Sequence, residues 1–292
     1  MPHLWIVLSL TSAFSLATSD ALTKRIITPA NEYAIAWLRI VYSLPVLAAA
    51  AAASPMPHLD AIFYRAFIAA LPLEIAAILL YYKALRVSPL SLSLPFLSFT
   101  PVFLVFFSWL IMGEKVSGTG AAGIALIALG GYSLNLSSLR TGPLGPLKAM
   151  LRERGSLYML AVSLIYSVTS SLGKLAITHS SPAFFGAAYY LVLAVCLLPV
   201  IAILSGGRRF FVELRGTARA ALLPGAFDAL HSVTHFFAVS MANVAYMVAI
   251  KRSSLLMGSA YGFLFFDERN VRERLTGSLL MFTGFVIIVV FG

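Results

Sequence analysis

The chain has 292 residues, of which 60% are hydrophobic and only 11% charged, with a formal net charge of +10 and a mean hydropathy of +0.92. A soluble domain carries roughly 25% charged residues, so this chain has too little polar surface to stay in water. Its Lys and Arg residues are not gathered in a stripe or tail, which argues against nucleic-acid binding and favours membrane lipid as their partner.

The apolar runs predict ten transmembrane helices, because one span needs about 20 apolar residues. In chain order the predicted spans are residues 4–22, 33–53, 62–85, 90–112, 118–136, 156–176, 182–204, 218–240, 244–266 and 273–291. No basic residue precedes the first run, so we expect a span there and not a signal peptide. The connections are short except residues 137–155, whose Gly and Pro content is typical of a linker.

The two halves of the chain match each other at an offset of 154 residues, without a gap. The matched pairs are Leu44/Leu198, Pro45/Pro199, Glu74/Asp228, Glu114/Glu268, Gly123/Gly277 and Gly130/Gly284. Such a series indicates duplication. We therefore predict an all-α integral membrane protein of two five-helix repeats, 1–137 and 156–292, joined by a linker over 138–155. Because five is odd, the second repeat enters the membrane in the opposite sense, as an inverted repeat.

The distribution of basic residues predicts the orientation, since Lys and Arg concentrate in cytoplasmic loops. The loops after the odd-numbered spans hold 15 of them: Lys24, Arg25, Lys83, Arg86, Arg140, Lys148, Arg152, Arg154, Arg208, Arg209, Arg215, Arg219, Arg269, Arg272 and Arg274. The other loops hold 3, namely Arg65, Lys115 and Lys174. We expect a multi-pass protein of the cell membrane (inner or plasma) with both termini outside the cytoplasm.

Several motifs resemble those of a known family. The segment Pro89–Pro95 (PLSLSLP), then Phe99-Thr-Pro101, Gly113-Glu-Lys115, Gly123 and Gly130, is similar to the end of an EamA repeat of the drug/metabolite transporter superfamily. Residues 245–254, then Phe266-Asp-Glu268, Gly277 and Gly284, look like a second copy. The resemblance implies secondary transport by alternating access, often export of amino acids or other metabolites. Relatives carry nucleotide sugars, sugar phosphates or lipid-linked sugars.

Two acidic residues fall near the middle of predicted spans. Glu74 lies in the third span and Asp228 in the eighth, and the repeat makes them counterparts. An ionisable group at this depth costs a few kcal/mol, which makes it a candidate for function. A carboxyl group there can exchange a proton for a substrate. The alternative is a structural role, in which each acid pairs with a Lys or Arg and holds helices together.

Two basic residues, Lys251 and Arg252, lie two turns into the ninth span. One of them is a candidate for binding a carboxylate or a phosphate, and Arg suits a bidentate anion. An internal ion pair with Glu74 or Asp228 is the alternative, and the residue pattern does not choose between them.

The eighth span also carries His231 and His235, which share a helix face with Asp228. This face is typical of a hydrogen-bonding or proton-relay role. No third His lies within a span, so we predict no metal site. A polar stripe on the first span ends at Asp20 and either lines a pathway or marks the end of the helix.

Pro95 and Pro101 free backbone carbonyls in the fourth span, where Ser98 either satisfies them or lines a cavity. This predicts either a broken helix at the transport site or a simple kink. Tyr189 is a candidate cavity residue, although span-end aromatics often anchor at the interface. The paired glycines seven residues apart predict close helix contact, within the fold or in a dimer.

The residues favour some classes of function over others. No Ser/His/Asp set has a convincing context, so we predict no enzyme and no cofactor. A channel is a remote alternative. The favoured function is a proton-coupled exporter of amino acids or similar small polar metabolites, acting as a monomer or homodimer. The rival is a carrier or flippase for an anionic phosphate-bearing or lipid-linked metabolite held by Lys251 or Arg252.

Overall fold

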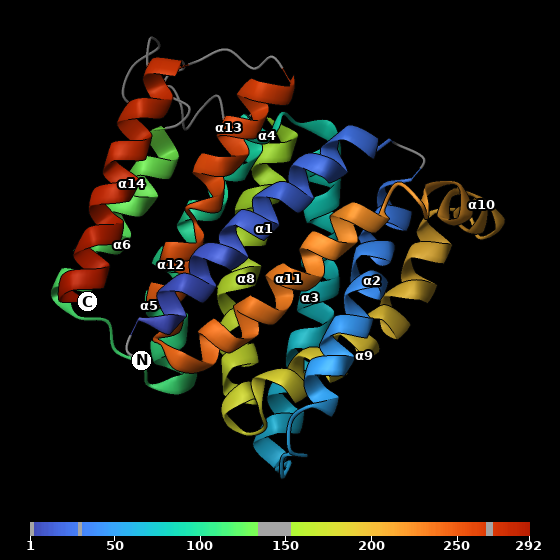
Figure 1. The fold of residues 1–292 in the computed structure, drawn as a ribbon, viewed down its shortest axis with the longest axis horizontal. Coiled ribbons are helices and arrows are strands. Elements are labelled where there is room, and N and C mark those ends of the chain that lie inside the picture. Colours follow the sequence, from blue (N-terminus) through green and yellow to red (C-terminus); the bar gives the residue numbers. More distant parts are fainter. Residues whose placement is uncertain (1–2, 29–30, 134–152, 267–270) are drawn as a thin grey trace.

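The computed structural model describes residues 3–28, 31–133, 153–266 and 271–292, and all regular structure within these ranges is helical. The helices are α1 (Leu4–Ile26), α2 (Glu32–Ala52), α3 (Ala61–Val87), α4 (Leu90–Ser93), the 3-10 helix η1 (Leu94–Phe99), α5 (Thr100–Met112), α6 (Gly118–Ser133), α8 (Arg154–Thr178), α9 (Pro182–Leu204), α10 (Arg208–Thr217), α11 (Leu222–Met241), α12 (Val244–Lys251), α13 (Ser254–Phe266) and α14 (Val271–Phe291). Figure 1 shows them as a bundle with both termini at the same end.

Each predicted span overlaps a helix or a broken helix. Within the described ranges, six segments are long and apolar enough to cross a membrane: α1, α2, α3, the stretch Leu94–Met112, α8 and α9. The other four predicted spans fall on α6, α11, the α12–α13 pair and α14. Of these, α6 is short, the α12–α13 pair is broken, and α11 carries Asp228 and two histidines. In α14 the described apolar stretch is Gly277–Phe291.

Helix ends follow their local sequence. Asp60 accepts a hydrogen bond from the Phe63 amide of 2.9 Å and so caps α3. That bond, with the neighbouring His179 ring nitrogen at 2.7 Å, holds the pKa of Asp60 below its usual value. Ser181 precedes Pro182 and caps α9 in the same way. Gly113 ends α5 with a φ of +71°, a conformation that side chains with a Cβ rarely adopt.

The predicted break in the fourth span is present. Residues 94–99 form η1, and Pro101 lies in the first turn of α5. The prediction of one continuous ninth span is wrong, because α12 ends at Lys251 and α13 begins at Ser254. The residues between them include neither Pro nor Gly, so the sequence held no breaker signal. The amphipathic helix α10 was also not predicted, and its residues were assigned to a loop.

Helices from the two halves of the chain pack against each other. α1 packs on α11, α3 on α8, α2 on α9, and α6 on α14. The glycines of α6 and α14 lie in the last of these contacts, since a Cβ on Gly123 would stand 2.9 Å from the carbonyl oxygen of Gly284. A Cβ on Gly130 would stand 2.7 Å from the carbonyl oxygen of Gly277. This glycine face is therefore used within the fold.

Candidate functional site

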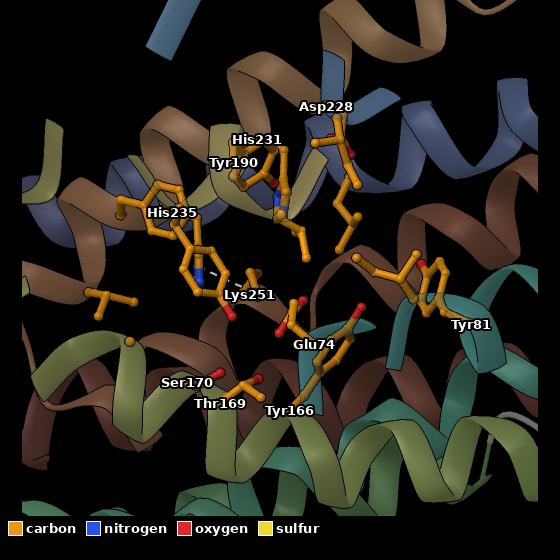
Figure 2. Close-up of a pocket in the computed structure, with 18 of the residues that line it drawn as sticks. Glu74, Tyr81, Tyr166, Thr169, Ser170, Tyr190, Asp228, His231, His235 and Lys251 are labelled. Carbon is orange, nitrogen blue, oxygen red and sulfur yellow. Dashed lines mark hydrogen bonds between the residues drawn. The ribbon is translucent and has the colours of Figure 1, made fainter. Parts of the chain in front are cut away.

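A cavity of about 170 Å³ lies between helices of both halves. Its walls come from α1, α2, α3, η1, α8, α9, α11 and the end of α12. Figure 2 shows acidic, basic and tyrosine side chains gathered around it. Seven of the nine predicted site residues line this cavity: Glu74, Tyr189, Asp228, His231, His235, Lys251 and Arg252.

The other two predicted residues, Asp20 and Ser98, are not part of the wall. Ser98 is fully buried and donates to the carbonyl oxygen of Pro95 at 2.6 Å, so it satisfies a backbone group in the η1 break. Asp20 lies behind the wall, in contact with Arg39.

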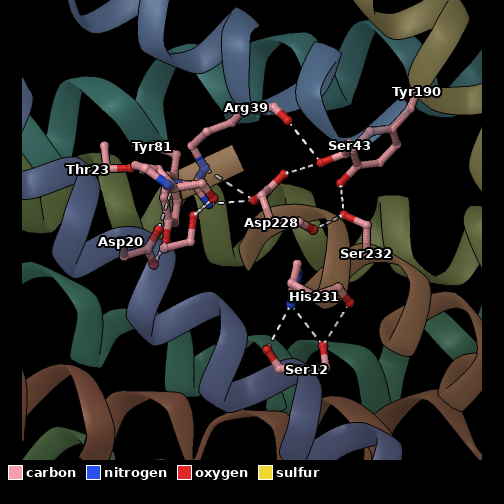
Figure 3. A network of polar contacts seen from close by, with 12 residues as sticks. Ser12, Asp20, Thr23, Arg39, Ser43, Tyr81, Tyr190, Asp228, His231 and Ser232 are labelled. Carbon is pink, nitrogen blue, oxygen red and sulfur yellow. Dashed lines mark hydrogen bonds and ion pairs between the residues drawn. The ribbon is translucent and has the colours of Figure 1, made fainter. Parts of the chain in front are cut away.

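Arg39 of α2 is the centre of a buried charge network (Figure 3). Its Nη2 lies 2.5 Å from Oδ1 of Asp228 on α11, and its Nη1 lies 3.0 Å from Oδ1 of Asp20 on α1. Its Nη1 also donates to the Thr23 hydroxyl at 3.2 Å. One guanidinium thus joins three helices from both halves of the chain.

Each carboxylate of this network has a further hydroxyl partner. The Tyr81 hydroxyl of α3 donates to Asp20, and the Ser43 hydroxyl donates to the second oxygen of Asp228 at 3.3 Å. The Ser43 hydroxyl has one proton and also donates to the Arg39 carbonyl oxygen at 2.9 Å, so the second oxygen of Asp228 shares this donor. The other three carboxylate oxygens each have a donor, and we call the Asp20–Arg39–Asp228 set the closed triad. It carries two negative charges and one positive charge.

The two histidines of α11 stack with ring centroids 5.7 Å apart, yet contact different partners. Nδ1 of His231 lies 2.8 Å from the Ser12 hydroxyl of α1. Nδ1 of His235 lies 3.3 Å from Nζ of Lys251. Among the described residues no third His, Cys, Asp or Glu gathers with another two in a metal-binding arrangement.

Three charged residues of the cavity, Glu74, Lys251 and Arg252, take part in none of the ion pairs of the described residues. Glu74 of α3 has the Thr169 hydroxyl as a hydrogen-bonding neighbour and Lys251 as a charged neighbour. Lys251 and Arg252 are 8% and 2% exposed. Arg252 donates from Nη2 to the Thr100 hydroxyl at 2.7 Å, and its Nε has no hydrogen-bond partner.

A second ion pair includes a residue of the cavity wall. Lys174 of α8 lines the cavity and donates to Glu114 and to the carbonyl oxygen of Ala242. The other oxygen of Glu114 accepts from the Val244 amide at 3.1 Å. This cluster ties the ends of α5, α8 and α11 to the start of α12.

Sequence reasoning did not place Arg39, Tyr81 or Lys174 among the site residues. Arg39 did carry a signal, since it is a charge within a predicted span. Lys174 was counted with the basic residues of a loop because it lies near the end of the predicted span 156–176, but α8 continues to Thr178. Tyr81 carried no signal, because its importance depends on its contact with Asp20.

The sequence and the fold are similar to those of known proteins. Residues 3–136 match the model of the EamA-like transporter family, which belongs to the drug/metabolite transporter superfamily. The matched stretch spans 134 of the 292 residues (3 to 136), so the first half of the chain is similar to that family. Members of the EamA-like family are transporters and not enzymes. Together with the apolar helices, this identifies the chain as a multi-pass membrane transporter.

Two further comparisons cover the whole chain. A solved crystal structure described only as "Crystal structure of protein" is 14% identical, and the alignment covers 98% of this chain and 99% of that chain with a TM-score of 0.63. This likeness shows a shared fold that includes the second half of the chain. No curated protein matches the sequence.

Proposed function

We propose that this EamA-like protein is a secondary transporter of a small polar metabolite, working by alternating access and coupled to protons. The observation that carries the proposal is Glu74, an acidic residue on a cavity between the two halves, without an ion-pair partner among the described residues. A carboxylate so placed exchanges a proton for a substrate.

The proposed architecture is ten transmembrane helices in two inverted repeats, 1–137 and 156–292, joined by the linker 138–155. Element bounds support it at the offset of 154 residues. The broken segment that begins at Leu90 and restarts at Thr100 corresponds to the one that begins at Val244 and restarts at Ser254. The helix contacts support it too, because exchanging the halves turns the α1–α11 contact into the α3–α8 contact. Discontinuous helices beside a central site are typical of such carriers.

The two acidic counterparts have different proposed roles. Asp228 is bound to Arg39, which already neutralises its charge. Glu74 has no such partner, so we assign the first proton to Glu74. Asp228 takes part in coupling only in a state in which Arg39 has moved away from it.

Export of amino acids or similar metabolites is the preferred form of the proposal. A cavity of about 170 Å³ is below the range of about 300–1,000 Å³ typical of sites for drug-sized ligands, which favours a small substrate. The rival, a carrier for a phosphate-bearing or lipid-linked metabolite, is favoured by one observation. Lys251 and Arg252 bring two adjacent positive charges to the same cavity.

The proposed topology places both termini outside the cytoplasm of the cell membrane. It rests on the basic residues of the loops, and both termini lie at one end of the bundle (Figure 1).

The test is a transport measurement on purified protein in liposomes. Substrate-induced currents on a solid-supported membrane are recorded under a proton gradient, for amino acids, polyamines, sugar phosphates and nucleotide sugars. We expect a saturable, proton-dependent current for an amino acid or similar molecule, and its loss in Glu74→Gln. Glu213→Gln on α10, away from the cavity, is the control. Currents in Glu74→Gln that keep their proton dependence would refute the assignment of Glu74.

A further inference from the structure

One face of α10 is packed against the rest of the protein. Phe210 and Thr217 are buried and Leu214 is partly buried, and the three share a face because they follow at i, i+4 and i+7. The helix packs on α2 and α9. Its end is fixed to α2, since the Tyr42 hydroxyl donates to the carbonyl oxygen of Ala218 at 3.0 Å. Protein contacts therefore set the position of α10.

The opposite face of α10 combines arginines with apolar side chains. Arg208, Phe211, Val212 and Arg215 follow at i, i+3, i+4 and i+7, and all four are exposed. The exposed fraction is 50% for Phe211 and 62% for Val212. Such a face is typical of a helix at the boundary between lipid headgroups and acyl chains. There the apolar side chains contact hydrocarbon, and the long arginine side chains reach the headgroups.

The neighbours of α10 in the chain place it at this boundary. α9 is long and apolar enough to cross a membrane, and its last two residues, Ile203 and Leu204, are 80% and 55% exposed. Leu222 and Leu223, at the start of α11, are also more than half exposed. Figure 1 shows α10 at the edge of the bundle, beside one end of α9. Exposed apolar surface thus lies on both sides of α10 along the chain, and α10 lies where that surface ends.

The charge of this segment is positive and is not neutralised by the described part of the protein. Residues 208–219 hold four arginines and a single acidic residue, Glu213, which gives a net charge of +3. The arginines are exposed, and none has a carboxylate within 4.0 Å among the described residues. They are Arg208, Arg209, Arg215 and Arg219. In the proposed topology this loop is cytoplasmic, where the leaflet surface carries anionic lipids. The phosphate of such a lipid complements the segment in charge.

We propose that α10 is an interfacial helix that binds an anionic phospholipid. Arg208 and Arg215 bind the headgroup phosphate, and Phe211 and Val212 contact the acyl chains. Guanidinium groups suit phosphate because they form paired, charge-assisted hydrogen bonds. A zwitterionic lipid has the same phosphate but no net charge to set against the +3 of this segment. The site lies outside the central cavity and does not depend on which molecule is transported.

Lipid binding gives the first test. Purified full-length protein in neutral detergent is titrated with phosphatidylglycerol, with phosphatidylcholine or with soluble glycerol 3-phosphate, and bound molecules are counted by native mass spectrometry. The variant is Arg208→Gln/Arg215→Gln. The control, Arg65→Gln/Lys115→Gln, removes the same charge from two residues that are exposed elsewhere on the protein.

We expect wild type and the control to bind phosphatidylglycerol more tightly than phosphatidylcholine. The α10 variant is expected to lose at least fivefold in affinity for phosphatidylglycerol, about the contribution of one basic residue near an anionic surface. Equal affinity for the two lipids, an unchanged affinity in the α10 variant, or an equal loss in the control overturns the proposal. Displacement of phosphatidylglycerol by an equal concentration of glycerol 3-phosphate also overturns it, because the site then takes a soluble phosphate.

The depth of α10 gives a second test that leaves the arginines in place. Cys196 is exposed, so a Cys196→Ser background is used, and a nitroxide label is attached to Val212→Cys or, as a deep reference, to Val195→Cys on α9. In vesicles that contain phosphatidylglycerol, electron paramagnetic resonance compares collisions with oxygen and with a water-soluble nickel complex. We expect the label at 212 to lie at phosphate depth, shallower than the label at 195. Nickel access equal to that of a label in water overturns the proposal. Neither test involves transport, so failure of the lipid site and failure of the proposed function are distinguishable.

Discussion

Substitution of Gly284 by Ala tests the contact between α6 and α14. A Cβ at this position would lie 2.5 Å from the carbonyl oxygen of Gly123 and 3.0 Å from the amide nitrogen of Ile127. Ordinary contacts begin near 3.4 Å, so the two helices must separate by about 0.9 Å (3.4 minus 2.5) at their closest point. The nearest atom is a backbone oxygen, so a change of rotamer, which could move the Ile127 side chain at 2.8 Å, cannot relieve the clash.

Overpacking of this kind costs about 1–3 kcal/mol. Ala gains roughly 1 kcal/mol over Gly in a helix from propensity, which offsets only part of that cost. The matched control is Gly118→Ala at the start of α6, where a new Cβ meets no atom within 4 Å. Its stability is expected to be equal to that of wild type or slightly higher.

The assay is thermal unfolding of the purified protein in detergent, followed by tryptophan fluorescence. We expect Gly284→Ala to melt clearly below both wild type and Gly118→Ala. Equal melting temperatures for the two variants would refute the close approach of α6 and α14, and with it the assignment of the glycine face to the interior of the fold.

Two further predictions concern the charge clusters. Arg39→Gln leaves two buried carboxylates without a cation and is expected to lower the free energy of unfolding by about 3–5 kcal/mol; a loss below about 1 kcal/mol in denaturant titration would contradict the closed triad. Lys174→Gln removes the contact with Glu114 and Ala242 and is expected to loosen the cavity wall at α8. In a Cys196→Ser background, Ser170→Cys on the cavity wall should then react several times faster with an impermeant thiol reagent. An unchanged rate would show that the Lys174 contacts do not restrict access to the cavity.

The sequence predicted those features that depend on composition and local signals. Long apolar runs gave the helices, and Pro95 and Pro101 marked the break that the structure has in η1. The second break could not be predicted because residues 251–254 are Lys-Arg-Ser-Ser and include neither Pro nor Gly. Arg252 contacts Thr100, the first residue of α5. A contact between residues so far apart in the sequence cannot be predicted from a local pattern.

For the site, too, the sequence predicted single residues but not the contacts between them. A charged side chain within a membrane span costs free energy, so each charge there is a candidate for function. Four of them were selected as site residues, and all four line the cavity: Glu74, Asp228, Lys251 and Arg252. Which charge neutralises which could not be predicted. The pairing of Arg39 with Asp228 joins residues 189 positions apart, and only the packing of α2 near α11 brings them together.

The packing of α1 on α11 and of α3 on α8 has a consequence for biosynthesis. Residues 4–26 leave the ribosome about two hundred residues before their partner, residues 222–241. During that interval the first half has faces without a neighbour, and Arg39 lacks Asp228. Asp20, only 19 positions from Arg39, can neutralise it from the start. The first half therefore enters the bilayer with a counter-ion for Arg39, and Asp228 contacts Arg39 only after the second half has been inserted.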